Sequence, residues 1–176
     1  MNKFYNKYAK NIYSQNGEDG IVEELLKRLN IENGWVCEFG AWDGKHLSNT
    51  FNLIENKNFN AVFIEGDKNK YKDLLKTVKE FPKIVPIQSM VDHNDSSNSL
   101  DNLLKQTDIP NDFELLSIDI EGNELDVLKG FDIKYWKPKI IIIEHNYEND
   151  KMRKITQIFE EKGYKKELEL FSFHDF

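Results

Sequence analysis

The sequence predicts an α/β domain in which a mainly parallel sheet is covered by helices on both faces. Two observations predict this class. Short apolar segments alternate with amphipathic segments five times along the chain, and the apolar segments are nearly continuous, as is typical of strands buried on both faces. The length of 176 residues fits one domain, 1–176, with an N-terminal cap segment and helix over 1–30 and a Rossmann-like core over 34–176.

The composition fits a globular protein that does not bind nucleic acid. Lys and Arg total 24, and Asp and Glu total 31, which gives a formal net charge of −7. Proteins that bind phosphate backbones gather basic residues, so we do not expect a nucleic-acid partner. Cys37 is the only cysteine, which excludes an internal disulfide and favours a reducing compartment. Since no segment resembles a signal peptide or reaches the ~18 apolar residues of a membrane span, we expect a cytoplasmic protein.

The first elements follow from periodicity and from their boundaries. A helix is expected over 18–29, because apolar residues recur there every three or four positions. The apolar segment 35–39 is brief and stops at Gly40, which indicates a buried strand. Capping side chains at 48–50 then begin a second helix at Phe51.

The middle of the chain repeats this alternation. A strand is expected over 61–65, followed by a helix through 71–78 that Pro82 halts. The next strand covers 84–87 and contains Pro86, which cannot donate a ladder hydrogen bond. We therefore expect this strand at an edge of the sheet.

The last elements complete the pattern. A short helix is expected over 100–104, a strand over 113–120 and a helix over 124–130 that ends in glycine. The segment 139–144 contains four consecutive isoleucines, which indicates a strand buried on both faces. A final helix is expected over about 151–162.

Acidic residues follow nearly every predicted strand. They are Glu38, Glu65, Asp92, Asp119 and Glu144. Because the carboxyl ends of parallel strands meet at one edge, we expect these side chains to converge on the crevice where doubly wound folds bind nucleotides. A carboxylate after the second strand accepts hydrogen bonds from ribose hydroxyls, which is the role expected of Glu65.

The glycine turn after the first strand distinguishes two cofactors. Gly40 and Gly44 are separated by three residues, whereas a dinucleotide fingerprint has the spacing G-x-G-x-x-G. Glu38 and Asp43 would repel a pyrophosphate but attract an ammonium and a sulfonium. The sign of the charge therefore favours S-adenosylmethionine over NAD, and a nicotinamide-dependent oxidoreductase is kept as the lesser alternative.

Several stretches together resemble the FkbM-type methyltransferases. The segment 118–130 is the most specific, since an acid-x-acid-Gly motif is followed there by a helix ending in Leu-Lys-Gly. The resemblance implies a class I methyltransferase fold, S-adenosyl-L-methionine as donor, and O-methylation of a sugar, glycan precursor or small metabolite. The stretches that carry it are 13–19, 38–44, 48–50, 117–130 and 143–146.

The resemblance also implies the donor-binding residues. Glu38, Gly40 and Ala41 would line the methionine moiety and Glu65 the ribose. Further members of this set are Trp42, Asp43, Gly44, Gly66, Met90, Val91, Asp92 and Asp119, of which Met90 and Val91 would flank the adenine and Asp92 would accept from its amino group.

Two residues are candidates for the general base. His145 follows a strand end and carries an imidazole, a group that ordinarily titrates near neutral pH, and Glu121 is the rival, which like-charge repulsion from Asp119 would favour. A less favoured mechanism uses Mg²⁺ held by Asp119, Glu144 and Asn146, whose oxygens suit this ion.

The N-terminal segment before the first helix has two interpretations. Ser14 or Asn16 caps the helix, and the acids complement its dipole. Alternatively, the segment folds over the donor site, where Gln15, Glu18 or Asp19 touches the methionine end, as the resemblance suggests.

The C-terminus departs from the family pattern. The class I sheet ends with a sixth strand and an antiparallel seventh, but only about a dozen residues follow Gly163. We expect this hairpin to be short or incomplete, which leaves a donor-binding but non-catalytic member as an alternative function. An unfinished edge would also favour a homo-oligomer.

Overall fold

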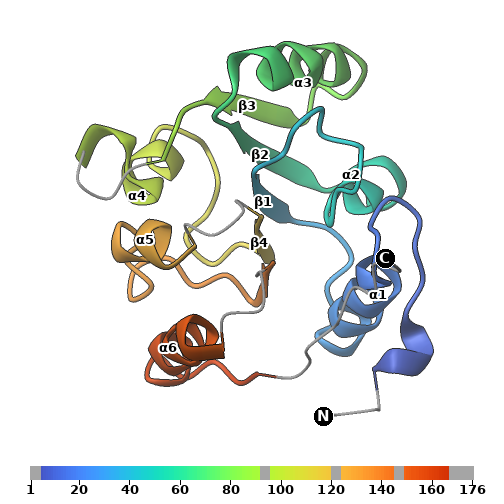
Figure 1. The fold of residues 1–176 in the computed structure, drawn as a ribbon. Helices are drawn as coiled ribbons and strands as arrows, with labels where there is room; N and C mark the ends of the chain where they lie inside the picture. Colours follow the sequence, from blue (N-terminus) through green and yellow to red (C-terminus); the bar gives the residue numbers. More distant parts are fainter. Residues whose placement is uncertain (1–4, 92–95, 120–123, 145–148, 167–176) are drawn as a thin grey trace, which may run out of the picture.

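The computed structural model describes residues 5–91, 96–119, 124–144 and 149–166. Its centre is a five-stranded sheet with all neighbouring strands parallel, in the order β3-β2-β1-β4-β5 (Figure 1). The strands are β1 (Trp35–Phe39), β2 (Asn60–Glu65), β3 (Ile84–Gln88), β4 (Leu115–Ile118) and β5 (Ile140–Ile143).

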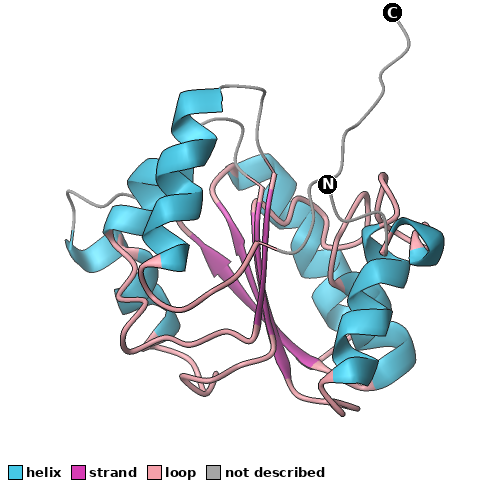
Figure 2. Ribbon diagram, turned by 90° about the horizontal axis from the view of Figure 1, so that it is seen from below, coloured by secondary structure: helices cyan, strands magenta, loops and turns pink. Residues whose placement is uncertain are grey.

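Helices cover both faces of this sheet, as Figure 2 shows. The helices on one face are α1 (Glu18–Arg28), α2 (Phe51–Lys57) and α3 (Lys68–Glu80), and on the other α4 (Leu100–Leu104), α5 (Glu124–Lys129) and α6 (Asn149–Glu160). Two short 3₁₀ helices, η1 (Asn6–Tyr8) and η2 (Ser96–Asn98), precede α1 and α4.

Each face of the sheet has its own apolar core. Phe63 of β2 packs with Phe51 of α2 and Leu74 of α3 on the first face. Ile64, the next residue of β2, packs with Leu104 of α4 and Phe159 of α6 on the second face. This alternation follows from the two-residue period of a strand, which sends successive side chains to opposite faces.

Each helix and strand expected up to Gly163 is present, with bounds that differ by up to three residues. The short or incomplete hairpin expected after Gly163 falls largely on 167–176, which lie outside the described residues. The expected edge position of the strand containing Pro86 is confirmed, since β3 lies at one end of the sheet. Pro86 is paired with Phe63 of β2 alone, and its missing N–H therefore costs no ladder bond on the other side.

The isoleucine strand differs from expectation. It was predicted to be buried on both faces, but only Ile140 is buried, and the other three residues of β5 are partly exposed. The reason is position: β5 is the last strand of the sheet within the described residues and has a neighbour only in β4. A run of β-branched residues does not distinguish a central strand from an edge strand.

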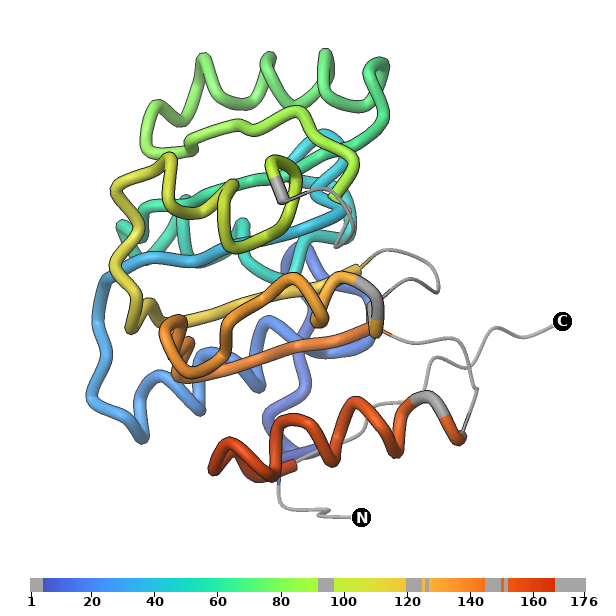
Figure 3. The backbone as a smooth tube through the Cα atoms, turned by 90° about the vertical axis from the view of Figure 1, so that its left-hand side faces the viewer, coloured from blue at the N-terminus to red at the C-terminus, as the bar shows by residue number. Residues whose placement is uncertain are grey.

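The first helix places the N-terminal segment at the edge of the sheet where the strands end. Figure 3 shows α1 running back along the sheet, opposite in direction to β1. Its first residues therefore lie at the edge where the strands end. No helix among the described residues is long and apolar enough to cross a membrane.

Candidate functional site

Three acidic residues and one glycine lie side by side where the strands end. Glu65, the last residue of β2, lies at the same level of the sheet as Gly40, Asp119 and Glu144, which directly follow β1, β4 and β5, and the four positions come in this order across the sheet. The ladder reaches this level, because the amide of Asp119 donates to the carbonyl of Phe39 at 3.0 Å. We name these four positions the acidic row. Its glycine leaves an open place between carboxylates.

Glu65 is buried and holds two backbone amides. Its Oε2 accepts from the amide of Trp42 at 2.8 Å, and its Oε1 accepts from the amide of Asp67 at 2.7 Å. A carboxylate has about four lone-pair positions. Glu65 therefore retains acceptor capacity for two hydroxyl groups while it fixes the backbone on either side of it.

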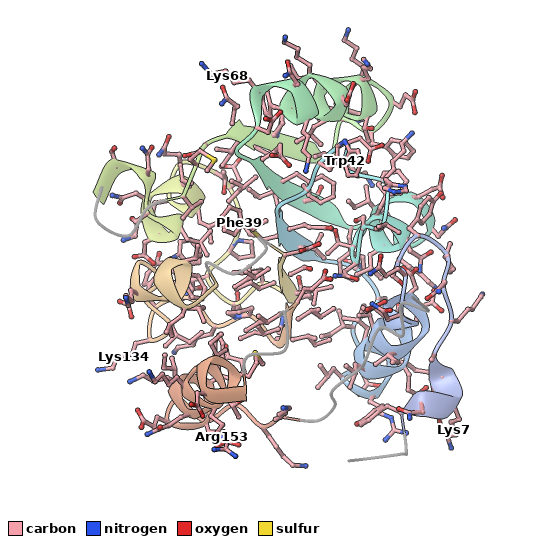
Figure 4. All side chains as sticks on the ribbon, viewed as in Figure 1. Lys7, Phe39, Trp42, Lys68, Lys134 and Arg153 are labelled. Carbon is pink, nitrogen blue, oxygen red and sulfur yellow. The ribbon has the colours of Figure 1, made fainter. Side chains whose placement is uncertain are left out.

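Trp42 has an unusual backbone conformation for an aromatic residue. Its φ is +45°, in the left-handed region that bulky residues rarely adopt. The bond from its amide to Glu65 helps to hold it there. Figure 4 shows its side chain beside α3, where the ammonium of Lys70 lies 4.9 Å from its ring centre, and 41% of Trp42 remains exposed.

Gly44 ends the tight part of the same loop. Its φ is +79°, and a Cβ at this position would lie 2.9 Å from Leu74 and 3.0 Å from Phe63. The loop is also tied to α3, because the hydroxyl of Thr77 donates to the carbonyl of Asp43 at 2.7 Å. Glycine is required here both by the backbone and by the packing.

Glu38 is the centre of a buried polar network. Its Oε2 accepts from the hydroxyl of Ser48 at 2.6 Å and from that of Thr50, and its Oε1 accepts from the amide of Asn49 at 3.4 Å. The side-chain amide of Asn49 donates in turn to Ser117 of β4 at 3.1 Å. All five residues are less than a tenth exposed. The network thus joins β1 and β4 to the residues that begin α2.

Burial raises the pKa of Glu38 to about 7. Desolvation of the charged form is the largest cause. The hydrogen bonds from Ser48, Thr50 and the amide of Asn49 act in the opposite direction, and the nearby negative charge of Asp119 adds to the rise. The carboxyl group therefore changes its charge near neutral pH.

The residues that were expected to contact the adenine come just after β3. Met90 is 73% exposed, and Val91 is partly buried. The side chain of Met90 lies against Gly66, where a Cβ would meet its sulfur. Asp92 lies outside the described residues.

The N-terminal segment wraps around the carboxylate of Asp19. Its Oδ2 accepts from the amides of Ile12, Tyr13 and Ser14 at 2.7 to 2.8 Å and from the hydroxyl of Ser14. The Ser14 hydroxyl accepts from the amide of Asp19 at 3.1 Å, and Ser14 thus satisfies an amide of the first turn. The N-cap position itself is Gly17, with φ +96°. The other oxygen of Asp19 is buried and has no hydrogen-bond partner among residues 5–91 and the later described ranges.

The other two N-terminal candidates differ in their surroundings. Glu18 Oε2 accepts from the amide of Asn16 at 2.7 Å and is therefore already engaged. Gln15 is partly buried, and its backbone carbonyl accepts from Asn11 at 2.8 Å. Its side-chain amide makes no hydrogen bond within the described part of the chain and is the better placed of the two to meet a ligand.

Of the catalytic candidates, the structure places Asp119, which is partly buried in the acidic row. Glu144 of the metal alternative is its exposed neighbour across β4 and β5. His145, Glu121 and Asn146 lie outside the described residues. In the part of the chain that is described, no group of three or more His, Cys, Asp and Glu side chains is arranged to hold a metal ion.

A comparison with models of protein families shows to which family this chain belongs. The model of the FkbM methyltransferase domain matches residues 45–166, which is more than half of the sequence. The chain belongs to the FkbM methyltransferase family. A comparison with curated protein sequences gave no significant match.

Solved structures similar to this FkbM family member are class I methyltransferases. TrmK of M. capricolum, solved with S-adenosyl-homocysteine, is 20% identical with a TM-score of 0.51, and the match covers 77% of this chain and 55% of TrmK. The precorrin-6y C5,15-methyltransferase of Geobacter metallireducens GS-15 is 17% identical with a TM-score of 0.54, over 91% and 79% of the two chains. M. jannaschii TYW2, solved with AdoMet, is 18% identical with a TM-score of 0.50, over 89% and 67%. At these identities the comparisons show the fold, and the chain spans about half the length of TrmK.

The FkbM-family chain contains site residues that sequence patterns did not indicate. Ser48, Asn49 and Thr50 were expected only to cap α2. The N-cap residue is Thr50, whose side chain makes no capping bond, while the Ser48 hydroxyl accepts from the amide of Phe51 at 3.0 Å. Their contact with Glu38 was not foreseen. Ser117 was missed as a site residue, although it lies two positions before Asp119 and hence on the same side of β4.

A cavity of about 610 Å³ is lined by residues of α1 and α2 and of the segments next to them, and none of its lining residues belongs to the acidic row. Its walls include Ile31, which precedes β1, and Phe59, which precedes β2. Charged residues of both signs line it, among them Glu23, Lys27 and Lys57. Ligands of doubly wound sheets bind outside the carboxyl ends of the strands, so this cavity is separate from the candidate site.

Proposed function

We propose that this FkbM-family protein transfers a methyl group from S-adenosylmethionine to a hydroxyl group of a sugar, a glycan precursor or a small metabolite. The observation that carries the proposal is the acidic row, in which Glu65 and Asp119 flank Gly40 and Glu144 lies beyond Asp119. This arrangement attracts a ligand with positive charge and repels a pyrophosphate. Family membership and the donor or its product in two structures of the same fold support it.

The residues present fit such a donor. Glu65 has acceptor capacity for two ribose hydroxyls after its bonds to Trp42 and Asp67 are counted. Gly40 has φ +84° and lacks a side chain at the centre of the row, which allows a ligand to approach the backbone. Exposed Met90 at the end of β3 offers an apolar surface for a base.

When bound, S-adenosylmethionine supplies an electrophilic methyl group on a sulfonium. The chain's main task is then to hold the acceptor oxygen in line with that group, and positioning of this kind contributes up to ~7–11 kcal/mol in the best model systems. Asp119 would stand beside the donor, and its charge would favour the cation. His145 or Glu121 would accept the hydroxyl proton.

Two measurements test the proposal. Thermal unfolding is followed with S-adenosylhomocysteine and, separately, with NAD, since a ligand present at 100 times its Kd stabilises the folded state by about 2.7 kcal/mol. We expect S-adenosylhomocysteine, and not NAD, to stabilise the folded state. Stabilisation by NAD alone would overturn the proposal in favour of an oxidoreductase.

Methyl transfer is then measured with isotopically labelled donor and a broad panel of sugars, glycans and small hydroxyl compounds. Incorporation of label into a hydroxyl oxygen is the expected result. Donor binding without transfer to any member of the panel would instead support a non-catalytic donor-binding role.

A further inference from the structure

Two carboxylates from neighbouring strands hold the two halves of the loop between β1 and α2. Glu65, the last residue of β2, accepts from the amide of Trp42 in the first half. Glu38, in β1, accepts from Ser48, Asn49 and Thr50 in the second half. The loop is therefore fixed at both of its ends before any ligand arrives.

The two carboxylates differ in what remains available to a ligand. Each oxygen of Glu65 accepts one amide. At Glu38, one oxygen takes two hydroxyls and the other takes a backbone amide. Both residues are buried, with 4% of Glu38 and 6% of Glu65 exposed, so the two differ in the donors that already surround them. The resemblance placed Glu38 against the methionine moiety, but its buried carboxylate is surrounded by donors from its own chain.

We propose that Glu38 is a positioning residue, which holds Ser48, Asn49 and Thr50 against the strand ends and does not itself touch the donor. This inference rests on the proposed function. Through Asn49 and Ser117 the hold extends from β1 to β4, the strand that carries Asp119 into the acidic row. Without these hydrogen bonds, the loop between β1 and α2 would no longer be fixed relative to the acidic row.

The charge of Glu38 matters to this role, because an ionised carboxylate is the stronger acceptor for the two hydroxyls. The ionisable groups on the elements around it include Asp119 directly after β4, Glu65 of β2, the Cys37 thiol beside it in β1, Asp43, Lys45 and His46 in the loop, and Asp19 of α1. The charge of Asp119 opposes ionisation of Glu38, whereas a bound cation would favour it. Affinity for the cationic donor is therefore expected to rise as pH increases through neutrality.

A double-mutant cycle tests the proposal with Glu38→Gln, Thr50→Val and the double variant. The Kd for S-adenosylhomocysteine is measured by calorimetry at pH 8, and thermal unfolding is measured in parallel. If both residues act through one hydrogen bond, each single variant weakens binding by about tenfold, and the double variant weakens it no further than the more affected single variant. If the double variant instead raised the Kd by the product of the two single factors, the two residues would act independently and the proposal would be overturned.

Thr50→Ser is the matched control, because it retains the hydroxyl. We expect it to bind like the wild type, and a loss equal to that of Thr50→Val would contradict the proposal. If Glu38→Gln fails to fold, this pair of Thr50 variants still decides the question, since both leave Glu38 in place. If the wild type binds no adenosyl compound at all, the proposed function fails rather than the role of Glu38.

A pH profile adds a readout that a merely structural role would not change. The affinity of the wild type for S-adenosylmethionine should increase between pH 6 and 8, and Glu38→Gln should abolish that increase while Glu65→Gln retains it. An unchanged profile in Glu38→Gln would overturn the proposal.

Discussion

Glu38 and Glu65 leave neighbouring strands on the same face of the sheet. Glu38 is paired with Phe63, and Glu65 follows Phe63 by two positions, so both carboxylates share one side. Each holds a different half of the loop between β1 and α2. The acids that follow the strands therefore have separate tasks, and the predictions below distinguish them.

Glu65→Gln should weaken donor binding strongly. A hydrogen bond to a charged group contributes about 1.5–3 kcal/mol, so loss of the charge facing two ribose hydroxyls should raise the Kd for S-adenosylhomocysteine by about tenfold or more. Calorimetry measures this effect. Glu32→Gln, at the opposite edge of the sheet and exposed, is the control and should bind like the wild type. An unchanged Kd in Glu65→Gln would refute the assignment.

Gly44→Ala should destabilise the fold more than Gly163→Ala. Both glycines have positive φ, +79° and +89°, so both substitutions carry a backbone cost of about 1–2 kcal/mol. Only at Gly44 would the new methyl group press on Leu74 and Phe63, whereas a Cβ at Gly163 would meet no heavy atom of the described residues within 4 Å, its two chain neighbours aside. We expect a further loss of about 1–3 kcal/mol at Gly44 from overpacking, measured by urea unfolding. Equal losses would show that the loop yields to the methyl group.

The free energy of unfolding should fall as pH rises from about 4.5 to 7. Burial raises the pKa of Glu38 to about 7 in the folded state, so over this range the folded state binds a proton that the unfolded state has released. The slope from one such group is at most about 1.4 kcal/mol per pH unit. Urea unfolding of the wild type and of Glu38→Gln at several pH values measures this slope, because the variant lacks the titrating carboxyl group. A constant difference between the two proteins across this range would contradict the predicted titration.

Asp19→Ala should release the N-terminal segment. Its carboxylate accepts from three backbone amides and one hydroxyl, and each buried donor left unsatisfied costs about 1–3 kcal/mol. Limited proteolysis with mass spectrometry should detect new cleavage within residues 9–17. Asp19→Asn, which retains one acceptor oxygen, should be cleaved less. The idea is wrong if Asp19→Ala resists protease as well as the wild type.

Gln15→Ala should weaken donor binding without lowering stability. The side-chain amide makes no hydrogen bond among the residues that the structure places, so its removal leaves no buried group unpaired. If the N-terminal segment contacts the methionine end, the Kd should rise severalfold at an unchanged melting temperature. Glu18→Ala is the comparison, because Glu18 is engaged with Asn16, and its donor affinity should be unchanged. Loss of affinity in Glu18→Ala alone would reverse the assignment.

The elements could be predicted because their signals are local. The strand over 35–39 has the predicted bounds, since a brief apolar run and a terminal glycine are sufficient to define it. The edge position of β3 was predicted from Pro86, whose ring removes one ladder donor. The exposure of β5 was not predictable in this way, because burial of a strand depends on how many neighbours the sheet provides.

The sequence by itself determined the order of helices and strands and the presence of an acid near the carboxyl end of each inner strand. Only the tertiary structure decided what those acids contact. Glu38 meets Ser48 and Thr50 from the far end of its loop, and Asn49 reaches Ser117, 68 positions away along the chain. Hydrogen-bond partners are set by which segments the packed sheet brings within about 3 Å of each other, and no local pattern of residue types contains that information.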